Sequence, residues 1–501
     1  MGEKILQINR KDNIAIALKE IEAGDIVKVK SQSIEVLNEI PLGHKIALKD
    51  IKKGDKVIRY GYEIGAAAED IKKGEWVHSH NLKTALKGKI DYHYEPQFDK
   101  IKRSEKVPNF LGYKRENNKV GIRNDVWIIN TVGCINKVVE KMAFKAEAKH
   151  QSLIEAGLID SIHAFPHPYG CSQLGGDLEN TQKSLAGLVN HPNAAAVLVV
   201  GLGCENNLIE DFKKYIGDYN KKRVKFLNLQ DVEDDMEIAE SLLDELLAYA
   251  KDFKQEEIPL SKLKIALKCG GSDSFSGVTA NPLLGKISDK IASYNGISIL
   301  TEVPEMFGAE KILMNRAKDK KTFNKVVKLI NDFKDYFLSH DQEIYENPSP
   351  GNKAGGITTL EEKSLGCTQK GGTGIVNDVF FYGEQVEGQG LNLLESPGND
   401  LVATTALTIA GAHLVIFTTG RGTPFGGAVP TIKVSTNNKI YAQKRNWFDF
   451  NAGQLLAGKD MESLTEEFFD YIIQVASKKI KTKNEINDYR EIAIFKNGVT
   501  L

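Results

Sequence analysis

The sequence lacks long apolar runs. Its longest uninterrupted one, Ala194–Val200, and shorter ones such as Leu414–Phe417 fall well short of the ~20 residues that span a membrane. It also lacks an excess of either charge, with 66 Lys+Arg against 67 Asp+Glu and a formal net charge of −1. This balance argues against a nucleic-acid scaffold or a polybasic membrane binder, so we expect neither nucleic acid nor membrane as a partner.

Cysteine is scarce, with five in 501 residues. A sparse and odd count does not build a disulfide framework, and the N-terminal residues contain no apolar signal-peptide core. We therefore expect a cytoplasmic protein with reduced thiols. The 41% of apolar and 27% of charged residues are typical of folded domains, and the length predicts two or three of them.

The N-terminal part repeats a short pattern three times. Ala, Ile, Gly, an acid and Val recur at fixed spacing from Ala17, Ala47 and Ala67. Each copy predicts a short helical turn, a tight turn at the Gly-acid pair and a strand, because Gly tolerates the positive φ of such turns. The uneven distance between copies excludes a solenoid. We expect a small, mostly β module over residues 1–85, followed by a charged, Tyr-containing linker over 86–108.

Residues 109–501 alternate apolar runs with helical patterns, which predicts a large parallel α/β region, divisible into two subdomains. Strands are expected at 126–132, 196–200, 265–267, 297–300 and 413–417. Ligands bind beyond the carboxyl ends of such strands, so we expect the polar strand ends to converge on one crevice. Segment 347–374, rich in Gly, Pro and Lys, is expected to be a long irregular loop.

His78 and His80 close the third repeat. On a strand, two such residues face the same side. Two imidazoles on one face suit a divalent metal, or an acid/base with its orienting partner. The alternative is a pair of surface histidines at a domain edge.

Four cysteines stand at predicted strand ends: Cys134, Cys171, Cys204 and Cys269. None forms Cys-x-x-Cys, so the spacing of a zinc ribbon is absent. One interpretation is convergence on an iron–sulfur cluster. The other, which we favour, is that these small side chains pack in tight corners between strand and loop.

Three loops carry further chemistry. Gly201-Leu202-Gly203 begins like the dinucleotide fingerprint, but Asn206 replaces its last Gly, so NAD is not expected. A Gly-rich entry to a helix can still bind a carboxylate. The loops Ser272–Ser276 and Thr418–Thr423 are rich in small hydroxylic side chains, which suits a polyhydroxylated ligand, and Arg421 can fork onto a carboxylate. Desolvated Lys or buried Glu side chains, among them Glu302, Glu305, Lys353 and Lys363, are candidate bases or else surface charges.

These motifs together resemble one family. Similar segments are Gly112–Arg115, Gly121–Asn124, His167–Gln173, Gly201–Asn207, Cys269–Asp273, Thr301–Glu305, Asn347–Asn352, Lys363–Gly366 and Phe417–Thr423. The family is that of the altronate and galactarate dehydratases, which are sugar-acid hydro-lyases. The resemblance implies an N-terminal module of the SAF or β-clip type and a Rossmann-like domain that is not a nucleotide site. In related sulfo-lyases the two parts are separate chains.

The resemblance also implies loss of water from D-altronate, giving 2-dehydro-3-deoxy-D-gluconate in hexuronate breakdown, with Fe²⁺ or Mn²⁺ as the metal. Removal of the C2 proton creates an enediolate that a metal stabilises. The C3 hydroxyl leaves as water and needs a general acid. Other sugar acids such as galactarate, a cluster-dependent hydro-lyase and a non-catalytic sugar-acid sensor stay open, and an NAD-linked oxidoreductase is disfavoured by the incomplete fingerprint.

The expected site lies between the small and large parts of the chain, in a homo-oligomer. The expected catalytic residues are His78, His80, His167 and Lys353. The expected substrate-binding residues are Arg123, Asn124, Ser272, Asp273, Ser276, Arg421 and Thr423. The candidate metal ligands are His78, His80, Cys171, Cys204 and Glu205.

Overall fold

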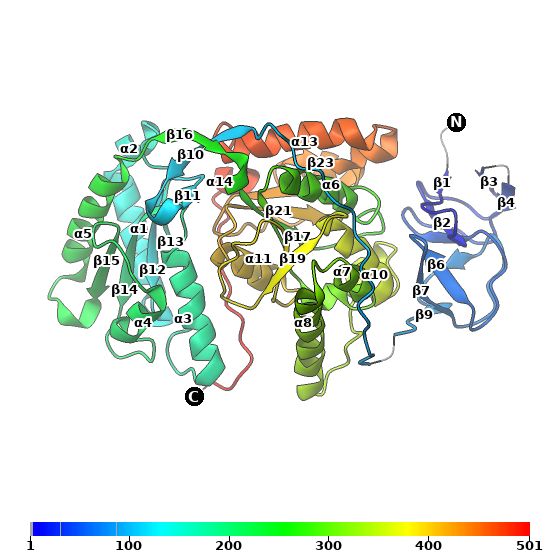
Figure 1. The fold of residues 1–501 in the computed structure, drawn as a ribbon, viewed down its shortest axis with the longest axis horizontal. Coiled ribbons are helices and arrows are strands. Elements are labelled where there is room, and N and C mark those ends of the chain that lie inside the picture. Colours follow the sequence, from blue (N-terminus) through cyan, green and yellow to red (C-terminus); the bar gives the residue numbers. More distant parts are fainter. Residues whose placement is uncertain (1–3, 31, 87, 501) are drawn as a thin grey trace.

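The computed structural model describes residues 4–30, 32–86 and 88–500, and Figure 1 shows three parts along its long axis. A small N-terminal β module (residues 4–86) stands at one end. A unit around a seven-stranded sheet lies in the middle, and a unit around a four-stranded sheet lies at the other end. All pairs within these two sheets are parallel. The predicted α/β fold with a small β module is confirmed.

The N-terminal module is built from short antiparallel strands: β1 (Ile5–Leu6), β2 (Ile14–Ala17), β3 (Ile26–Val29), β4 (Gln32–Glu35), β5 (Lys45–Ala47), β6 (Lys56–Arg59), β7 (Tyr62–Ala67), β8 (Trp76–Val77) and β9 (Leu82–Lys83). The repeat's glycines, at 24, 54 and 74, have φ of 85°, 86° and 87°, as their turns require. The predicted helical turns are wrong. Ile21 pairs with Ile40 in a single β-bridge because its backbone groups bond across the module instead of locally.

A strap, residues 88–108, contains no helix or strand and runs along the central unit. Its backbone bonds that unit at Gln97 N–Asn315 O (2.8 Å) and Ser104 N–Ser293 O (2.9 Å). The Tyr92 hydroxyl donates to Glu310, and the hydroxyl of Tyr94 donates to a carbonyl nearby, both at 2.6 Å. The strap is therefore tied down along its length.

The four-stranded sheet has the order β13-β12-β14-β15. Its strands are β12 (Asp125–Asn130), β13 (Ile162–Ala164), β14 (Ala194–Gly201) and β15 (Val224–Asn228). All of β14 is buried, as the apolar run of a strand covered on both faces predicts. One face packs on α1 (Asn136–Lys149) and α5 (Asp235–Ala250), and the other on α3 (Gly175–Val189) and α4 (Ile209–Ile216); α2 is Gln151–Glu155.

The seven-stranded sheet has the order β19-β20-β18-β17-β21-β22-β23. Its strands are β17 (Lys264–Cys269), β18 (Ile297–Leu300), β19 (Val376–Phe380), β20 (Gly390–Leu394), β21 (Leu414–Thr419), β22 (Thr431–Ser435) and β23 (Phe450–Asn451). The core of one face includes α6 (Ala280–Ser293), α8 (Lys320–Ser339) and α13 (Met461–Ala476). On the other face α11 (Asp400–Ile409) packs against α3, so a single apolar core joins the two units.

Smaller elements complete the fold. Strands β10 (Asn109–Lys114), β11 (Val120–Gly121) and β16 (Gln255–Pro259) form an antiparallel sheet of three strands between the units. Further helices are α7 (Glu310–Asn315), α12 (Asn438–Gln443) and α14 (Lys483–Ile486). The short 3-10 segments include η2 (Gly133–Ile135), η5 (Val303–Met306) and η6 (Thr368–Gly371).

The strands predicted in the large region are confirmed, but the single crevice is wrong. The strands divide between two sheets, so their carboxyl ends open at two edges. In each sheet later strands are added on both sides of the first strand. In the smaller sheet β12 lies between β13 and β14, and in the larger sheet β17 lies between β18 and β21. Such switch points are where ligands bind in parallel sheets. We call them the four-strand edge and the seven-strand edge.

The segment 347–374 is not the irregular loop that its composition predicted. It forms α9 (Pro350–Ala354) and α10 (Leu360–Cys367). Ser349 makes a capping box with Asn352, and the Thr359 side chain accepts from the amide of Glu362. These caps satisfy free N–H groups at the start of each helix, and this stabilisation offsets the low helix propensity of the nearby glycines.

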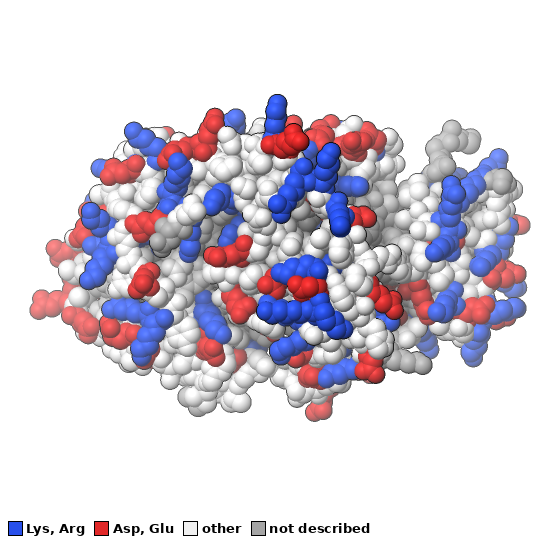
Figure 2. Space-filling model, in the orientation of Figure 1, with Lys and Arg blue, Asp and Glu red and all other residues white. Residues whose placement is uncertain are grey.

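The surface matches the balanced composition. On the face that Figure 2 shows, basic and acidic side chains are interspersed over all parts. Among the described residues, no helix combines the length and hydrophobicity needed to cross a bilayer.

Candidate active site

A buried charge network lies at the seven-strand edge. Lys268, fully buried in β17, contacts Glu302 and donates to Asp400 at 2.8 Å. Burial opposes its charge, but Asp400 and Glu302 outweigh burial and raise the pKa of Lys268 above its ordinary value. Glu302 follows β18 with a left-handed φ of 72°, a strained conformation that is found most often at functional sites.

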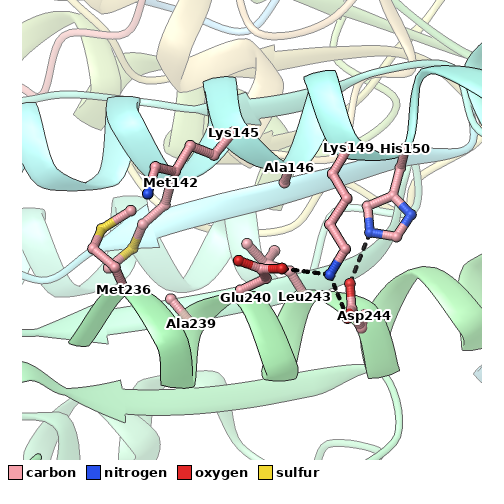
Figure 3. A pocket seen from close by; sticks show the side chains of 10 residues that line it. All are labelled: Met142, Lys145, Ala146, Lys149, His150, Met236, Ala239, Glu240, Leu243 and Asp244. Atoms are coloured by element: carbon pink, nitrogen blue, oxygen red, sulfur yellow. Dashed lines mark hydrogen bonds and ion pairs between the residues drawn. The ribbon is translucent and has the colours of Figure 1, made fainter. Parts of the chain in front are cut away.

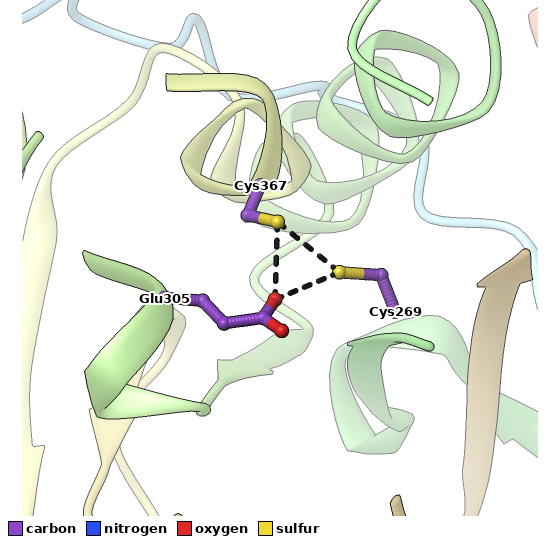
Figure 4. A group of neighbouring side chains, drawn as sticks. All are labelled: Cys269, Glu305 and Cys367. Atoms are coloured by element: carbon purple, nitrogen blue, oxygen red, sulfur yellow. Dashed lines mark hydrogen bonds between the residues drawn. The ribbon is translucent and has the colours of Figure 1, made fainter. Parts of the chain in front are cut away.

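Two thiols and a carboxylate meet beside this network (Figure 4). Glu305 Oε2 lies 3.1 Å from Cys269 Sγ and 3.0 Å from Cys367 Sγ, and the two sulfurs are 3.3 Å apart. Lys370 Nζ lies 2.8 Å from Cys269 Sγ, and Lys363 Nζ lies 2.8 Å from Glu305 Oε1. Burial opposes the charge of Glu305, but Lys363 and Lys370 outweigh it and lower the carboxyl pKa. The hydrogen bond with Cys269, together with burial, raises the pKa of the Cys367 thiol.

The group of Cys269, Glu305 and Cys367 has ligand atoms within 4.8 Å of one another, the spacing of a metal site. Its charges are already balanced, because three lysines, at 268, 363 and 370, face three carboxylates, at 302, 305 and 400. Metal binding would release the two thiol protons, so a divalent ion held here would replace two protons and leave the net charge of the group unchanged. The group therefore remains a candidate metal site, with thiolate ligands that suit iron better than Mn²⁺.

Hydrogen bonds to the Asp273 side chain fix the conformation of the loop after β17. The carboxylate accepts from Ser276 N (3.0 Å), Thr436 Oγ1 (2.9 Å) and Asn437 Nδ2 (3.0 Å). Asp273 and Ser276 are thus engaged in shaping the loop. The hydroxyl of Ser272 is buried without a hydrogen-bond partner in the structure, so it is the member of this loop with bonding capacity left over.

Arg421 stands at the switch point itself. Its amide donates to Gly271 O across the edge (3.0 Å), and its side chain is exposed. Thr423 lies two residues farther and accepts from the amide of Phe425 (3.2 Å). The seven-strand edge thus brings together five of the predicted residues: Ser272, Asp273, Ser276, Arg421 and Thr423.

Gly420 is required by close packing at this edge, because a Cβ there would overlap the Asp273 carboxyl group. We expect Gly420→Ala to destabilise the protein by about 1–3 kcal/mol, the usual cost of overpacking. Urea unfolding measures it. Gly176→Ala is the matched control, since no atom lies within 4 Å of a Cβ in that helix, and it should shift stability by less than about 1 kcal/mol. Equal stability of the two variants would contradict the packing described here.

The N-terminal module docks at the same edge through a buried triad. Lys45 Nζ lies 3.0 Å from Glu362 Oε2, and Arg59 contacts the same carboxylate. Arg59 also donates to Ser274 O at 2.6 Å. Burial opposes the charge of Glu362, but Lys45 and Arg59 outweigh it and lower its pKa to about 2. Burial lowers the pKa of Lys45 to about 8. The carboxylate is thus the charge that both cations stabilise.

The predicted histidine pair lies in a turn after β8, so its expected place on a strand is wrong; Asn81 closes this turn by accepting from the His78 amide. Both rings contact Trp76, with centroids 5.4 Å away for His78 and 5.1 Å for His80. His44 lies 4.8 Å from the His78 ring and meets Ala354 O of α9 (3.3 Å). His44 therefore connects the ring of His78 to α9, which carries the exposed Lys353.

His78 has free bonding capacity. Its Nδ1 atom is buried without a hydrogen-bond partner in the structure. Burial, with the charge of Lys45 as a smaller cause, lowers the pKa of His78 to about 4. The ring is therefore neutral at pH 7, and neutral imidazole is the form that binds a metal. His78 could therefore supply one ligand to a divalent metal, and the exposed His80 contacts the same tryptophan.

The remaining candidates at the four-strand edge shape its loops. His167 Nε2 lies 2.8 Å from Asn130 O, and burial lowers its pKa to about 4. Glu205 accepts from Thr131 Oγ1 (2.5 Å) and Gly203 N (2.6 Å). Both side chains are thus engaged within the protein, so neither is free to act as a base or a ligand in this arrangement.

The cysteines do not pack as a group in strand–loop corners. Cys269 is buried, but three others are exposed: Cys134, Cys171 and Cys204. The packing interpretation favoured by the sequence is therefore wrong for these three. All three lie at the four-strand edge, apart from the histidines of the N-terminal module.

Arg123 and Asn124 join neither edge. They precede β12 and so lie at its amino end, opposite the carboxyl edge. Arg123 pairs with Glu485 at 2.6 Å, and the Asn124 amide donates to the carbonyls of Leu158 (2.7 Å) and Ala250 (2.9 Å). These bonds connect segments of the large region and leave no free donor directed at a ligand site.

Several residues of the seven-strand network were not among the predicted site residues: Lys45, Arg59, Lys268, Glu362, Cys367, Lys370 and Asp400. Lys268 carried a signal, because a lysine inside the run Ile265–Leu267 to Cys269 is unusual in a strand buried on both faces. Lys370 and Cys367 carried none, since each reaches the edge only through the packing of the α10 segment against β17.

A pocket between α1 and α5 is separate from these sites (Figure 3). Its floor includes Met142 and Leu243, while Lys149 bonds Asp244 at 2.8 Å on its rim. It contains none of the predicted site residues, so we assign it no part in catalysis.

Comparison with known proteins covers the whole chain. The family models are the altronate/galactarate dehydratase SAF domain (residues 3–85), the D-galactarate dehydratase/altronate hydrolase second domain (112–251) and the D-galactarate/altronate dehydratase C-terminal domain (260–500). A Bacillus subtilis (strain 168) protein named altronate dehydratase is 52% identical over 504 residues, covering 100% of both chains. An Escherichia coli (strain K12) protein of the same name is 50% identical over 498 residues, covering 99% of each. A galactarate dehydratase (L-threo-forming) of E. coli K12 is 30% identical over 517 residues, covering 98% of this chain and 96% of its own.

Proposed function

Because the chain belongs to the D-galactarate/altronate dehydratase family, we propose that it is a hydro-lyase that removes water from D-altronate and forms 2-dehydro-3-deoxy-D-gluconate in hexuronate catabolism. The identity to the two altronate dehydratases carries this proposal: it is 52% and 50% over the full chain, against 30% to the galactarate dehydratase.

The proposed site is the seven-strand edge where the N-terminal module covers it. Contacts run from the histidines to Arg421: His44 meets α9 at Ala354, the next residue Gly355 packs on Asp273, and Asp273 packs under Gly420. These contacts connect the N-terminal module to the loop at the switch point, so we place the substrate where the two parts meet.

The residues have complementary roles in this proposal. Arg421 holds the substrate carboxylate, and the unpartnered hydroxyl of Ser272 bonds a substrate hydroxyl. His80 accepts the C2 proton, and the Lys353 ammonium protonates the leaving C3 hydroxyl. The C2–H and C3–O bonds break, a C2=C3 bond forms, and water leaves; the enol then tautomerises to the keto acid.

The proposal includes a divalent metal, Fe²⁺ or Mn²⁺, held by His78 through its free Nδ1. Imidazole suits either ion. Such an ion supplies positive charge that stabilises the enediolate formed when the C2 proton is removed. Burial, with smaller contributions from the charges of Lys45 and His44, lowers the pKa of His78 and keeps its ring in the neutral form that binds a metal.

A substrate panel tests the function. Purified protein is assayed with hexonates and hexarates for 2-keto-3-deoxy acid, with added Fe²⁺, added Mn²⁺ or chelator. We expect turnover of altronate that chelator abolishes and one of the metals restores. Turnover of galactarate alone would change the substrate and retain the chemistry. Binding without turnover of any acid would replace the proposal with a sugar-acid sensor.

A further inference from the structure

We propose that Cys134, Cys171 and Cys204 are the protein ligands of an iron–sulfur cluster at the four-strand edge. The proposal concerns cofactor binding and stands apart from the proposed function, because it uses none of the residues assigned to catalysis.

Exposure is the first argument. Free cysteine is among the most buried residue types, because its side chain behaves as a small hydrophobe. The two cysteines of the seven-strand edge, at 269 and 367, follow this rule, whereas all three at the four-strand edge are exposed. Core packing therefore does not explain why three thiols face solvent at one sheet edge, and a shared ligand does.

The three cysteine-bearing loops form one structure. The Gly133 amide, next to Cys134, donates to Tyr169 O at 2.8 Å, two residues before Cys171. The amide of Asn207 donates to Gly170 O at 3.0 Å, which joins the loop of Cys204 to that of Cys171. The same Asn207 bonds Thr131 O through its side chain (3.1 Å) and so reaches the first loop. The thiols are therefore presented on a common base.

The base is fixed before any ligand binds. The hydrogen bonds of His167 and Glu205 described above stabilise these loops. A Cβ at Gly170 would overlap Thr131 O, so the loops approach as closely as their backbones allow. The Ser172 amide bonds the Asn206 side chain (2.8 Å), and Gln230 contacts Cys204 Sγ at 3.7 Å. Such a preformed site lowers the conformational cost of binding a rigid cofactor.

The surroundings favour negative charge. Each cysteine-bearing loop leads into the start of a helix, namely α1, α3 and α4. The amino ends of three helices thus lie at this edge, where their free N–H groups favour an anionic cofactor. The edge is also a switch point of a parallel sheet, the usual place for a ligand.

The spacing distinguishes a cluster from a single ion. Within the part of the chain that the structure describes, the Cys269 group alone brings three potential ligand atoms within 4.8 Å of one another. At least one pair of the three exposed sulfurs is therefore more than 4.8 Å apart. In a cluster each thiolate binds a different iron, so wider spacing is required. Three thiolates also leave one iron of a four-iron cluster open to an oxygen ligand.

Anaerobic reconstitution tests the proposal. The full-length protein is incubated anaerobically with ferric iron, sulfide and a thiol reductant that supplies the ferrous part, and is then desalted. Iron, acid-labile sulfide and visible absorption are then measured. We expect iron and sulfide in equal amounts, with sulfide-to-iron charge-transfer absorption. Cys134→Ser, Cys171→Ser and Cys204→Ser should each lower both contents together, and the triple variant should lose them. Ser172→Ala, in the same loop as Cys171, should retain both.

Folding is checked on the cluster-free proteins. Because the three thiols are exposed, their replacement by serine should leave the unfolding temperature of the cluster-free form unchanged. The proposal would be overturned if the wild-type protein bound no iron, or if it bound zinc or iron without sulfide. It would also be overturned if the triple variant retained the cluster. A bound cluster in a protein without altronate turnover would refute the proposed function alone.

Discussion

Glu362→Gln is expected to destabilise the protein by about 3–5 kcal/mol, the usual cost of removing one partner from a buried ion pair. The substitution leaves Arg59 charged and buried without its counterion, and Lys45 loses the carboxylate that its Nζ faces at 3.0 Å. Urea unfolding measures the loss. Because this triad joins the N-terminal module to α10, limited proteolysis in the strap should also accelerate.

The dependence of the free energy of unfolding on acid pH gives a second measure of the stabilisation that Glu362 provides. The folded pKa of Glu362 is about 2, below its ordinary value of 4.5, so its stabilising effect is complete above pH 4.5 and is lost as pH falls towards 2. The shift corresponds to roughly 3 kcal/mol. The stability difference between wild type and Glu362→Gln should therefore narrow over this acid range.

Glu140→Gln is the matched control. Its carboxylate pairs with Lys137 on the exposed surface of α1 (2.6 Å), where ion pairs contribute below about 1 kcal/mol. If Glu362→Gln were no more destabilising than Glu140→Gln, the buried triad would not be what holds the module.

His78→Ala is expected to lower kcat by about 10²-fold or more, within the range that a positioned catalytic imidazole contributes. The reason is loss of the buried Nδ1, which has no hydrogen-bond partner in the structure and is free for a metal. Turnover of altronate at saturating Fe²⁺ or Mn²⁺ measures the effect, and metal content after desalting is the second readout. His80→Ala should lower kcat while retaining more of the metal.

His93→Ala serves as the control, since His93 is an exposed histidine on the strap. It should keep both turnover and metal. Near-normal turnover and metal content in both His78→Ala and His80→Ala would refute the role assigned to the histidine pair.

The sequence predicted the strands well because a strand buried on both faces leaves a continuous apolar run, as in β14 and β18. It did not predict that these strands divide between two sheets. An apolar run specifies burial, whereas the choice of neighbour depends on helices such as α3 and α11, whose contact becomes visible only in three dimensions.

The residues of the candidate site could be predicted where polar side chains come shortly after the end of a strand. Ser272 and Arg421 were found in this way, since they come directly after β17 and β21. Lys370 was not, because it reaches Cys269 through tertiary packing over about a hundred residues of chain. The exposure of Cys171 was also beyond the pattern, since the sequence around a buried and an exposed thiol at a strand end is alike.

The strap gives the joined chain a property that two separate chains would lack. It keeps the N-terminal module beside the central unit, so docking of the module is intramolecular, with an effective concentration in the millimolar range for a short tether. Mass action then does not separate the module from α9 and α10 when the protein is diluted. Two separate chains that met through the same contacts would dissociate on dilution, whereas in this chain the N-terminal module remains docked on α9 and α10 at any concentration.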